Sequence, residues 1–485
     1  MSKLISAVGL TLDTAYQKIS DDEWRQLIDM AIGRGALKKR DDLLAGKAIN
    51  QSENRAALHP ALRNLSNRAM TIDGIDVMPL VKNVWQRMSG FCNQLMGITD
   101  IICLGIGGSD WGPRLVCDAL YHINPKENNA IRLHFVANID SAELATALSR
   151  AQPHSTRVLI TSKTFTTLET LRNAQTVINW LKQHNATPSQ IKKSLIGITA
   201  NPEAAEAFGI APDNIYPFWD WVGGRFSVWS AVGFPIAIKF GFDTYMDFLA
   251  GAHAMDEHFI TAPATENMPL TLALTLIHNQ KKHGITAKAL IPYAHALRLL
   301  PEWLQQLEME SHGKTVTMSG ETCDPTSPVV FGSAGSNSQH SYFQMLHQGS
   351  QIIPVDFIAV QEPMSQLPEA KEHHEALIAN CLAQAQALAN GSNETNAYNS
   401  CPGNRPSNLL WVKKLDAYHL GALLALYEHR ALCLGAIWNL NSFDQPGVEL
   451  GKKLAKPIQQ ALHGDNSALN GIDEITAARI KWLNS

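Results

Sequence analysis

Short apolar runs alternate with helical patterns from about residue 100 onward. The runs form two series, which cover 101–106, 133–136, 158–161 and 195–199, and then 285–293, 329–331 and 352–360. A probable helix follows each run of the first series, and this alternation is typical of βαβ units with parallel strands. An aromatic, Gly-rich connection at 216–235 separates the two series. The sequence therefore predicts two α/β domains with mainly parallel sheets flanked by helices.

The flanking regions have helical patterns. Amphipathic pieces near 22–32 and 78–95 predict a helical N-terminal arm, and a helical part is expected from about Glu369 onward. A length of 485 residues is too long for one simple core. The predicted division is a helical arm at 1–95, a first α/β domain at 96–235, a second at 236–440 and a helical C-terminal region at 441–485.

The composition limits the classes of partner and cellular environment. A formal net charge of −4 gives no general reason to bind nucleic acid or an anionic membrane. The seven cysteines are scattered, odd in number and without a C-x-x-C pair, so reduced thiols are expected, with no disulfide framework or zinc site. No signal-peptide pattern opens the chain, and Glu428, His429 and Arg430 interrupt its most hydrophobic long segment. We predict a cytoplasmic protein without a transmembrane span.

Residues 104–113 read Leu-Gly-Ile-Gly-Gly-Ser-Asp-Trp-Gly-Pro. A strand that ends in glycines, before a helix that restarts after Pro113, allows backbone N–H groups to converge on an anion or a sugar oxygen. The nucleotide-binding patterns fail here, because Asp110 replaces the last glycine of G-x-G-x-x-G and Pro113-Arg114 replaces the Lys-Ser/Thr of a P-loop. A tight strand-to-helix turn without a ligand is the alternative interpretation.

A second strand-to-helix connection, 161–169, is rich in hydroxyl groups. Thr166 and Glu169 fit a capping box, which alone accounts for only part of the stretch. Ser162, Thr164 and Thr167 remain as hydroxyl donors beside a helix N-terminus, with Lys163 as a cation. These groups favour the binding of a phosphomonoester.

The stretch 304–314 predicts the end of a helix that carries Glu310. Pro301 suits the first helical turn and Gly313 suits the C-terminal cap. Gln306 lies four residues before Glu310 on the same helix face, close enough to orient it. Glu310 is a candidate general base. A solvated helix end is the alternative, because most surface glutamates have no special role.

Three further cationic or titratable positions stand out. Arg225 follows two glycines among bulky aromatics, so it is either part of a buried structural pair or a stabiliser of developing negative charge. His340 is expected in the first turn of a helix at 341–348, where it could exchange a proton near neutral pH. A helix that starts at Pro446 carries Lys452, which shares a face with Gln445. Taken alone, such a lysine is usually solvated.

Six separated motifs together resemble the glucose-6-phosphate isomerase (phosphoglucose isomerase) family. In chain order they are Gly-Ile-Gly-Gly-Ser-Asp, Ser-Lys-Thr-Phe-Thr-Thr, Gly-Gly-Arg-Phe-Ser, Met-Glu-Ser-His-Gly-Lys, Ser-Asn-Ser-Gln-His and Phe-Asp-Gln-Pro-Gly-Val-Glu-Leu-Gly-Lys. The resemblance implies two sugar-isomerase-type (SIS) domains and a homodimer without metal or organic cofactor. It also implies interconversion of glucose 6-phosphate and fructose 6-phosphate through a cis-enediolate, in glycolysis and gluconeogenesis.

The resemblance also implies residue roles. Glu310 would move a proton between C2 and C1, Arg225 would stabilise the enediolate, and Lys452 would open the sugar ring with a His340 donated by the partner subunit. The implied substrate-binding residues are Ser109, Ser162, Thr164 and Thr167 for the phosphate, with Lys163 nearby, and Gly108, Gly224, Gln306 and Gln445 lining the site. Pro446 and Ser338 depart from residues that the family often has, which puts fine geometry in doubt and leaves the chemistry intact.

Two other functions remain as alternatives. A non-catalytic sugar-phosphate sensor would need the hydroxyl-rich turn but would not need Glu310, His340 and Lys452 together. A broader isomerase that also accepts mannose 6-phosphate would differ only in a pocket shape that sequence does not show.

Overall fold

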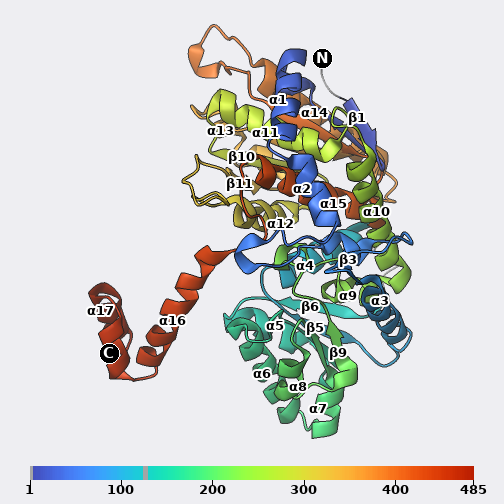
Figure 1. Cartoon of the computed structure of the whole chain (residues 1–485), viewed down its shortest axis with the longest axis vertical. Helices are drawn as coiled ribbons and strands as arrows, with labels where there is room; N and C mark the ends of the chain where they lie inside the picture. Colours follow the sequence, from blue (N-terminus) through green and yellow to red (C-terminus); the bar gives the residue numbers. More distant parts are fainter. Residues whose placement is uncertain (1–3, 124–128, 485) are drawn as a thin grey trace. The chain divides into compact units, whose positions relative to one another are not determined.

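The computed structural model describes residues 4–123 and 129–484 (Figure 1). Its contacts divide the chain into a large first unit, Met1–Ser442, and a small second unit, Phe443–Ser485. The first unit contains both large sheets. The expected division of the first unit at residue 235 stays a prediction.

Five parallel strands form the first sheet of the described chain, in the order β6-β5-β7-β8-β9 (Figure 1). Their bounds are Asp100–Leu104 for β5, Arg132–Val136 for β6, Thr156–Thr161 for β7, Leu195–Thr199 for β8 and Ile215–Pro217 for β9. All residues of β5 and β8 are buried, as expected for inner strands covered on both faces. The four runs predicted from the sequence are therefore confirmed as parallel strands.

Helices connect these strands. They are α4 (Gly108–Ile123), α5 (Ser141–Arg150), α6 (Leu168–Gln183), α7 (Pro188–Ser194) and α8 (Pro202–Phe208). Val177 and Leu181 of α6 pack in one buried cluster with Ile102, Val158 and Ile160 of the sheet. Because the strands are parallel, each strand-to-helix turn lies at the same edge of the sheet.

The second sheet has six strands within the described residues, in the order β1-β2-β13-β12-β10-β11. Their bounds are Leu4–Ala7 for β1, Leu10–Asp13 for β2, Ala287–Tyr293 for β10, Val329–Gly332 for β11, Val355–Val360 for β12 and Ser407–Val412 for β13. The three predicted runs of the second series are confirmed as parallel strands. The arm at 1–95, expected to be helical, begins instead with the antiparallel hairpin β1-β2, and β13 lies in the region after Glu369 that was expected to be helical. The hairpin is local, but its strand β2 joins the sheet by pairing with β13, a segment far away in sequence that local patterns do not reveal.

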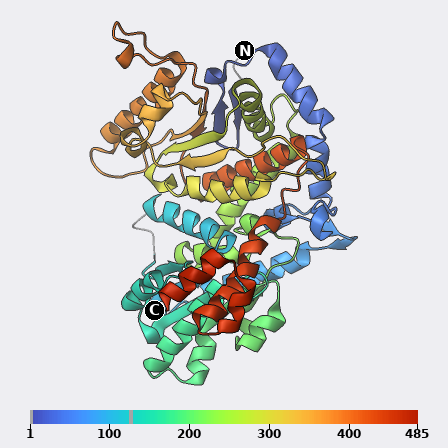
Figure 2. The same ribbon diagram turned by 90° about the vertical axis from the view of Figure 1, so that its left-hand side faces the viewer.

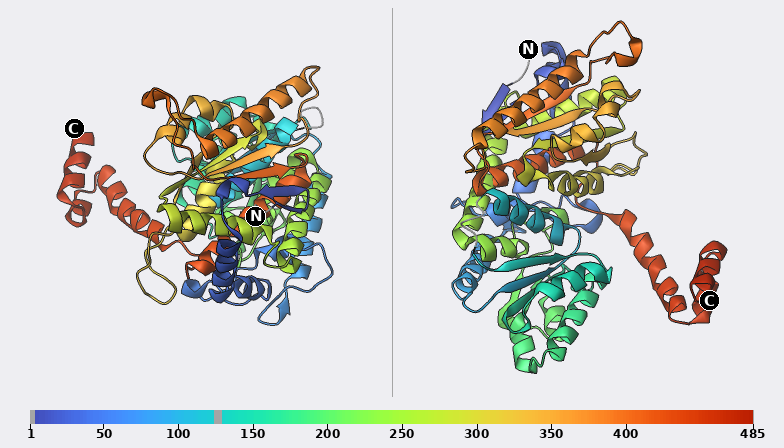
Figure 3. Two further views of the ribbon diagram at one scale, coloured as in Figure 1. Left: turned by 90° about the horizontal axis from the view of Figure 1, so that it is seen from above. Right: turned by 180° about the vertical axis from the view of Figure 1, so that it is seen from behind.

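Helices cover both faces of the second sheet. Helix α14 (Ala370–Asn390) packs Cys381, Ala385 and Leu388 against Ile291 and Phe357. Helix α15 (Ala417–Ile437) lies on the opposite face (Figures 2 and 3). Successive strand residues point to opposite faces, so the side chains between those of the α14 cluster point toward α15.

The remaining elements surround these sheets or belong to the second unit. In the first unit they are η1 (Ala15–Gln17), α1 (Asp21–Gly33), α2 (Ala36–Leu44), η2 (Gln51–Glu53), η3 (His59–Arg63), β3 (Thr71–Ile72), β4 (Ile75–Asp76), α3 (Met78–Cys92), η4 (Pro153–Ser155), η5 (Pro212–Asn214), η6 (Gly224–Phe226), η7 (Ala231–Gly233), α9 (Phe234–Phe240), α10 (Phe242–Thr261), α11 (Met268–His283), η8 (His295–Leu297), α12 (Leu300–Gln305), η9 (Gln306–Glu310), η10 (Asn337–His340), α13 (Phe343–Gln348) and η11 (Ala397–Asn399). The second unit contains η12 (Pro446–Val448), α16 (Glu449–Leu462), η13 (Asn466–Gly471) and α17 (Glu474–Leu483).

Among the described residues, α15 is the one helix long and apolar enough to cross a membrane by length and composition. Its most apolar window is completely buried inside the fold, and the helix also contains Glu428, His429 and Arg430. These features are typical of a core helix.

Candidate active site

Glu310 lies in a π-helical turn. Helix α12 begins with Pro301 in its first turn, as predicted, and widens after Gln305 into η9, a π-helix over Gln306–Glu310. Gln306 Nε2 donates to Glu310 Oε2 at 3.0 Å, which confirms the expected contact between these side chains. The Glu310 side chain is 23% exposed, so a ligand can reach it. π-Helical turns of this kind are rare overall, but those that do occur are often found at functional sites.

Gly313 ends this helix by a different route from the one predicted. It does not have a left-handed backbone conformation. Its N–H donates to the Met309 carbonyl at 2.8 Å, and a Cβ at Gly313 would lie 2.5 Å from that same oxygen. Glycine is therefore needed here for close approach and not for positive φ.

Arg225 is the buried cation of the site. Its Nε donates to Ser311 Oγ at 2.8 Å, and its Nη2 donates to the Ser442 carbonyl at 2.6 Å. Its Nη1 lies 3.4 Å from Glu310 Oε2, so the guanidinium faces the candidate base directly. The sequence left open whether Arg225 has a structural or a chemical role. The contacts are compatible with both roles, because Nε and Nη2 of the guanidinium bind the protein while Nη1 faces the carboxylate.

The glycines after β5 bring a third segment to this cluster. A Cβ at Gly108 would lie 2.0 Å from the Gly224 carbonyl oxygen, so only glycine permits the contact between the two turns. Gly107 has a φ of +60°, and its Cβ would meet the Gln306 side chain at 3.1 Å. The predicted Gly108, Gly224, Arg225, Gln306 and Glu310 thus come together.

Helix α4 starts earlier than the sequence suggested. It begins at Gly108, and Pro113 lies inside it, whereas a restart after Pro113 was expected. Proline at this position cannot donate to the carbonyl four residues earlier, and its ring crowds that carbonyl, so the helix start at Gly108 must be stabilised by other contacts. Ser109 consequently sits in the first turn of α4, beside the glycine contact.

The residue after Ser109 is a buried carboxyl group. Arg114 Nε lies 3.0 Å from both oxygens of Asp110, and Arg114 Nη2 donates to Glu143 at 3.0 Å. Burial raises the pKa of Asp110 to about 6, although Arg114 opposes the shift. Asp110 therefore titrates in mildly acidic solution, next to Ser109.

The hydroxyl-rich turn between β7 and α6 does not contain the capping box expected at Thr166 and Glu169. Thr167 is the N-cap residue of α6, and its side chain makes no cap hydrogen bond. The Thr167 hydroxyl instead lies 3.0 Å from Ser162 Oγ, and Thr164 Oγ1 lies 2.7 Å from Thr166 Oγ1. The first turn of α6 therefore keeps N–H groups without a side-chain cap.

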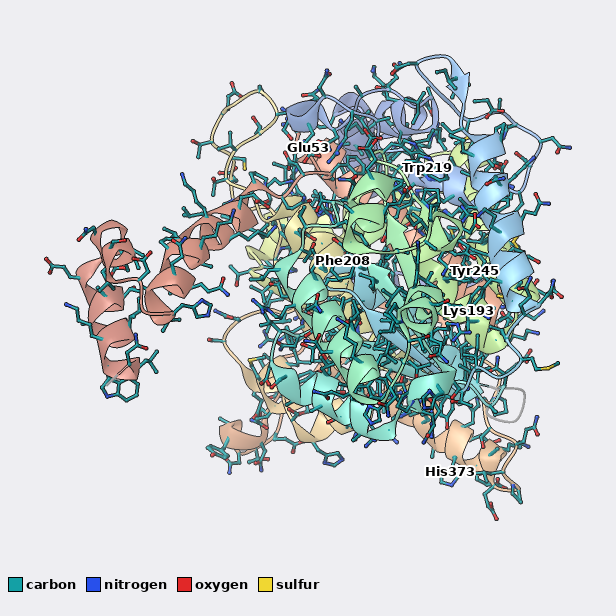
Figure 4. The ribbon with its side chains drawn as sticks, turned by 90° about the horizontal axis from the view of Figure 1, so that it is seen from below. Glu53, Lys193, Phe208, Trp219, Tyr245 and His373 are labelled. Carbon is teal, nitrogen blue, oxygen red and sulfur yellow. The ribbon has the colours of Figure 1, made fainter. Side chains whose placement is uncertain are left out.

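Lys163 connects this turn to the segment that leads to Arg225. Its ammonium donates to the carbonyls of Asp220 and Val222, both at 2.8 Å. Trp219, labelled in Figure 4, stacks on Trp221 of the same accepting segment, with ring centroids 5.0 Å apart. Burial lowers the pKa of Lys163 to about 8. Lys163 thus has a structural task that the sequence did not suggest.

The remaining predicted site residues are His340, Gln445 and Lys452. His340 is exposed at the end of η10, and the following helix α13 starts only at Phe343, so the expected position in that helix's first turn is wrong. Gln445 and Lys452 belong to the second unit, where Lys452 Nζ donates to Glu449 at 2.7 Å. The predicted helix start at Pro446 is confirmed as η12, which leads into α16.

Sequence reasoning missed Ser311 and Ser442, which hold Arg225. Ser311 directly follows Glu310, so its position in the motif was a usable signal. Ser442 contributes a backbone carbonyl, which any residue could supply, and no pattern would have identified it. Among the described residues, no group of three or more His, Cys, Asp or Glu side chains could hold a metal ion.

The fold and the cluster define a class: an α/β isomerase of sugar phosphates, with a candidate base beside a buried cation and an uncapped, hydroxyl-rich helix start. The family model described as phosphoglucose isomerase matches residues 13–480. This chain belongs to the phosphoglucose isomerase family.

Named relatives resemble the chain over nearly its whole length. The glucose-6-phosphate isomerase of Cupriavidus metallidurans is 46% identical, over 98% of this chain and 91% of the relative. That of Ralstonia pickettii is 45% identical, over 95% of this chain and 88% of the relative. The crystal structure of a glucose-6-phosphate isomerase from Chlamydia trachomatis superposes with a TM-score of 0.87 at 30% identity, over 97% of this chain and 92% of that one.

Proposed function

We propose that this chain catalyses the reversible aldose-ketose isomerisation of glucose 6-phosphate and fructose 6-phosphate. The carrying observation is the Glu310 carboxylate, which is reachable by a ligand and lies 3.4 Å from the buried guanidinium of Arg225. Family membership supports the same reaction, because the relatives are named for it. The activity corresponds to a step of glycolysis and gluconeogenesis.

The chemistry requires a base beside a positive charge. A C–H bond next to a carbonyl is a weak acid, so its removal needs a positioned base and stabilisation of the developing oxyanion. In our proposal Glu310 takes the proton from C2 of the open-chain aldose, and Arg225 stabilises the cis-enediolate while the proton on O2 passes to O1. Glu310 then returns its proton to C1. The hydrogen bond from Gln306 orients the carboxylate. Triosephosphate isomerase uses a glutamate in the same way on another fold.

The hydroxyl-rich turn is proposed to bind the phosphate. Ser162, Thr164 and Thr167 surround the uncapped start of α6, and N–H groups at a helix N-terminus favour an anion. Ser109 in the first turn of α4 adds a fourth hydroxyl. Lys163 is proposed to act mainly by tying this turn to the Arg225 segment, through its bonds to two carbonyls. Gly108 and Gly224 would line the space between.

Ring opening is assigned to His340 and Lys452, and Gln445 is proposed as a further lining residue. We propose a homodimer in which His340 serves the site of the partner subunit. The exposure of His340 at the end of η10 supports such a role. Exposed large apolar side chains in the second unit also favour a protein partner: Leu450 64%, Leu454 50%, Ile475 65% and Trp482 74%. A cytoplasmic location is proposed as well, and the seven free thiols agree with it.

Purified protein is expected to convert fructose 6-phosphate to glucose 6-phosphate with EDTA present and no nucleotide. The product is measured enzymatically in timed samples. Mannose 6-phosphate, offered in a parallel reaction, decides whether the pocket also accepts the C2 epimer. Saturable sugar-phosphate binding without turnover by the folded protein would favour the sensor alternative instead.

The assignment of His340 across the dimer predicts complementation. Glu310→Gln and His340→Ala homodimers are each expected to be inactive. After subunit exchange, half of the dimers are mixed and carry one complete site, so about one quarter of wild-type activity should return. The measurement is turnover before and after exchange.

A matched mixture controls this experiment. Glu310 and Arg225 lie 3.4 Å apart in one chain, so mixing Glu310→Gln with Arg225→Lys leaves no complete site and should restore nothing. Failure of the His340→Ala mixture to recover, with exchange verified by mass-tagged subunits, would assign His340 to its own chain's site or to none.

A further inference from the structure

A buried cluster of four charged side chains lies behind the π-turn that carries Glu310. Glu308, two residues before Glu310, accepts from Lys288 Nζ at 2.9 Å and from Arg430 Nη1 at 2.6 Å. The exposed fractions of these three residues are 1%, 2% and 1%. The same five-residue turn therefore presents one carboxylate to the core and one to the candidate site.

A second carboxylate completes the cluster. Asp356 Oδ2 lies 3.7 Å from Lys288 Nζ and 3.5 Å from Arg430 Nη1. Asn408 Nδ2 donates to Asp356 Oδ1 at 2.7 Å. Two cations and two carboxylates thus balance in the interior, which is the condition under which buried charge is tolerated.

The partners of Glu308 belong to the buried core of the fold. Lys288 belongs to β10 and Asp356 to β12, two neighbouring parallel strands, and Arg430 belongs to the fully buried helix α15. Burial alone would raise the pKa of Glu308, but Arg430 and Lys288 outweigh it and hold the pKa below its ordinary value. Glu308 is therefore ionised at neutral pH and bound to the sheet and to α15.

This anchoring bears on the chemistry because Glu308 and Glu310 share one irregular turn. A π-turn is a rare departure from regular α-helical geometry. The contacts that anchor one side chain of the turn therefore help to set the orientation of its other side chains. We propose that Glu308 is a positioning residue, which fixes the π-turn on Lys288 and Arg430 so that the Glu310 carboxylate meets Arg225 and the C2 proton. This inference rests on the proposed isomerase function and names a residue outside the substrate site.

The test is Glu308→Gln, which keeps the shape of the side chain and removes its charge. A displaced base affects the proton transfer more than substrate binding, and a misplacement of 1 Å can cost about 100-fold in rate. We expect kcat to fall about 10- to 100-fold while KM stays within about twofold. Exchange of the C2 proton with solvent should slow in parallel, and inhibition by inorganic phosphate should be unchanged.

Asp100→Asn is the matched control. Asp100 is a fully buried carboxylate that pairs with Arg132 and His134 at the first residue of β5, the opposite end of that strand from the Gly107-Gly108 turn. Its loss should lower Tm and leave kcat unchanged. Comparison of Asp100→Asn with Glu308→Gln thus separates the effect of losing a buried charge from the effect of displacing Glu310.

Arg430→Lys keeps the inference testable if Glu308→Gln does not fold. It retains the positive charge but shortens the reach of the 2.6 Å bond, so a smaller fall in kcat at constant KM is expected. Folded Glu308→Gln or Arg430→Lys with wild-type kcat and C2 exchange would overturn the positioning role while the isomerase function stands. Absence of turnover in the wild type would overturn both.

Discussion

Glu310→Gln is expected to lower kcat for isomerisation by about 10³- to 10⁴-fold while sugar-phosphate binding is retained. The amide has nearly the shape of the carboxylate but cannot accept the C2 proton. It still lies in the π-turn beside Gln306 and Arg225, so the groups proposed to hold the sugar phosphate are unchanged. The measurements are kcat and the release of deuterium from C2-labelled glucose 6-phosphate into solvent.

Glu302→Gln provides the control for this variant. Glu302 lies in the first turn of α12, the helix that leads into the π-turn, and it precedes Glu310 by about two helical turns. Its kcat should equal that of the wild type. If Glu310→Gln released deuterium at the wild-type rate, Glu310 would lose the role of base, and another carboxylate would have to carry the proton.

Arg225→Lys is expected to lower kcat by about 10²- to 10³-fold, because the lysine keeps the positive charge but no longer holds it at the distance and angle that stabilise the enediolate. A lysine ammonium cannot reproduce the planar fork that donates to Ser311 and Ser442 while facing Glu310. Loss of a buried charged hydrogen bond should also cost about 2 kcal/mol of folding stability. Steady-state kinetics and thermal unfolding measure the two effects separately.

Arg132→Lys is the corresponding control. Arg132 also binds a carboxylate through two donors, Nε and Nη2 to Asp100, but its side chain is 51% exposed and lies at the far end of the strands. A small decrease in Tm and an unchanged kcat are expected, because exposed ion pairs contribute little. A wild-type kcat for Arg225→Lys would leave the buried guanidinium with a structural role only.

The local predictions that failed share one cause. The capping box at Thr166 and Glu169 followed a valid rule, but the Ser162 and Thr164 hydroxyls offered Thr167 and Thr166 other partners. The helix expected after Pro113 began at Gly108, where contact with the Gly224 turn decides the backbone path. In each case contacts made by residues distant in space or across the turn outweighed the local preference.

The same reason limited the prediction of strands. The run at 195–199 is apolar throughout and was recognised, because a fully buried parallel strand has that pattern. The strand at Leu4–Ala7 has only four residues, and the strand at Ser407–Val412 sits between long helices. Leu4–Ala7 pairs with the neighbouring strand Leu10–Asp13, and that strand joins the sheet through Ser407–Val412, which is hundreds of positions away in sequence.

The sequence by itself determined the class of fold, the family and four of the residues that meet around Glu310, namely Gly108, Gly224, Arg225 and Gln306. Apolar alternation, turn glycines and hydroxyl clusters are patterns of neighbouring residues, so they can be recognised in the sequence alone. The tertiary structure alone decided that Glu310 stands in a π-turn, that Lys163 binds two carbonyls and that Glu308 is anchored by Lys288 and Arg430. Those features depend on side chains that folding brings together, because a buried charge is tolerated only when it is paired or hydrogen-bonded.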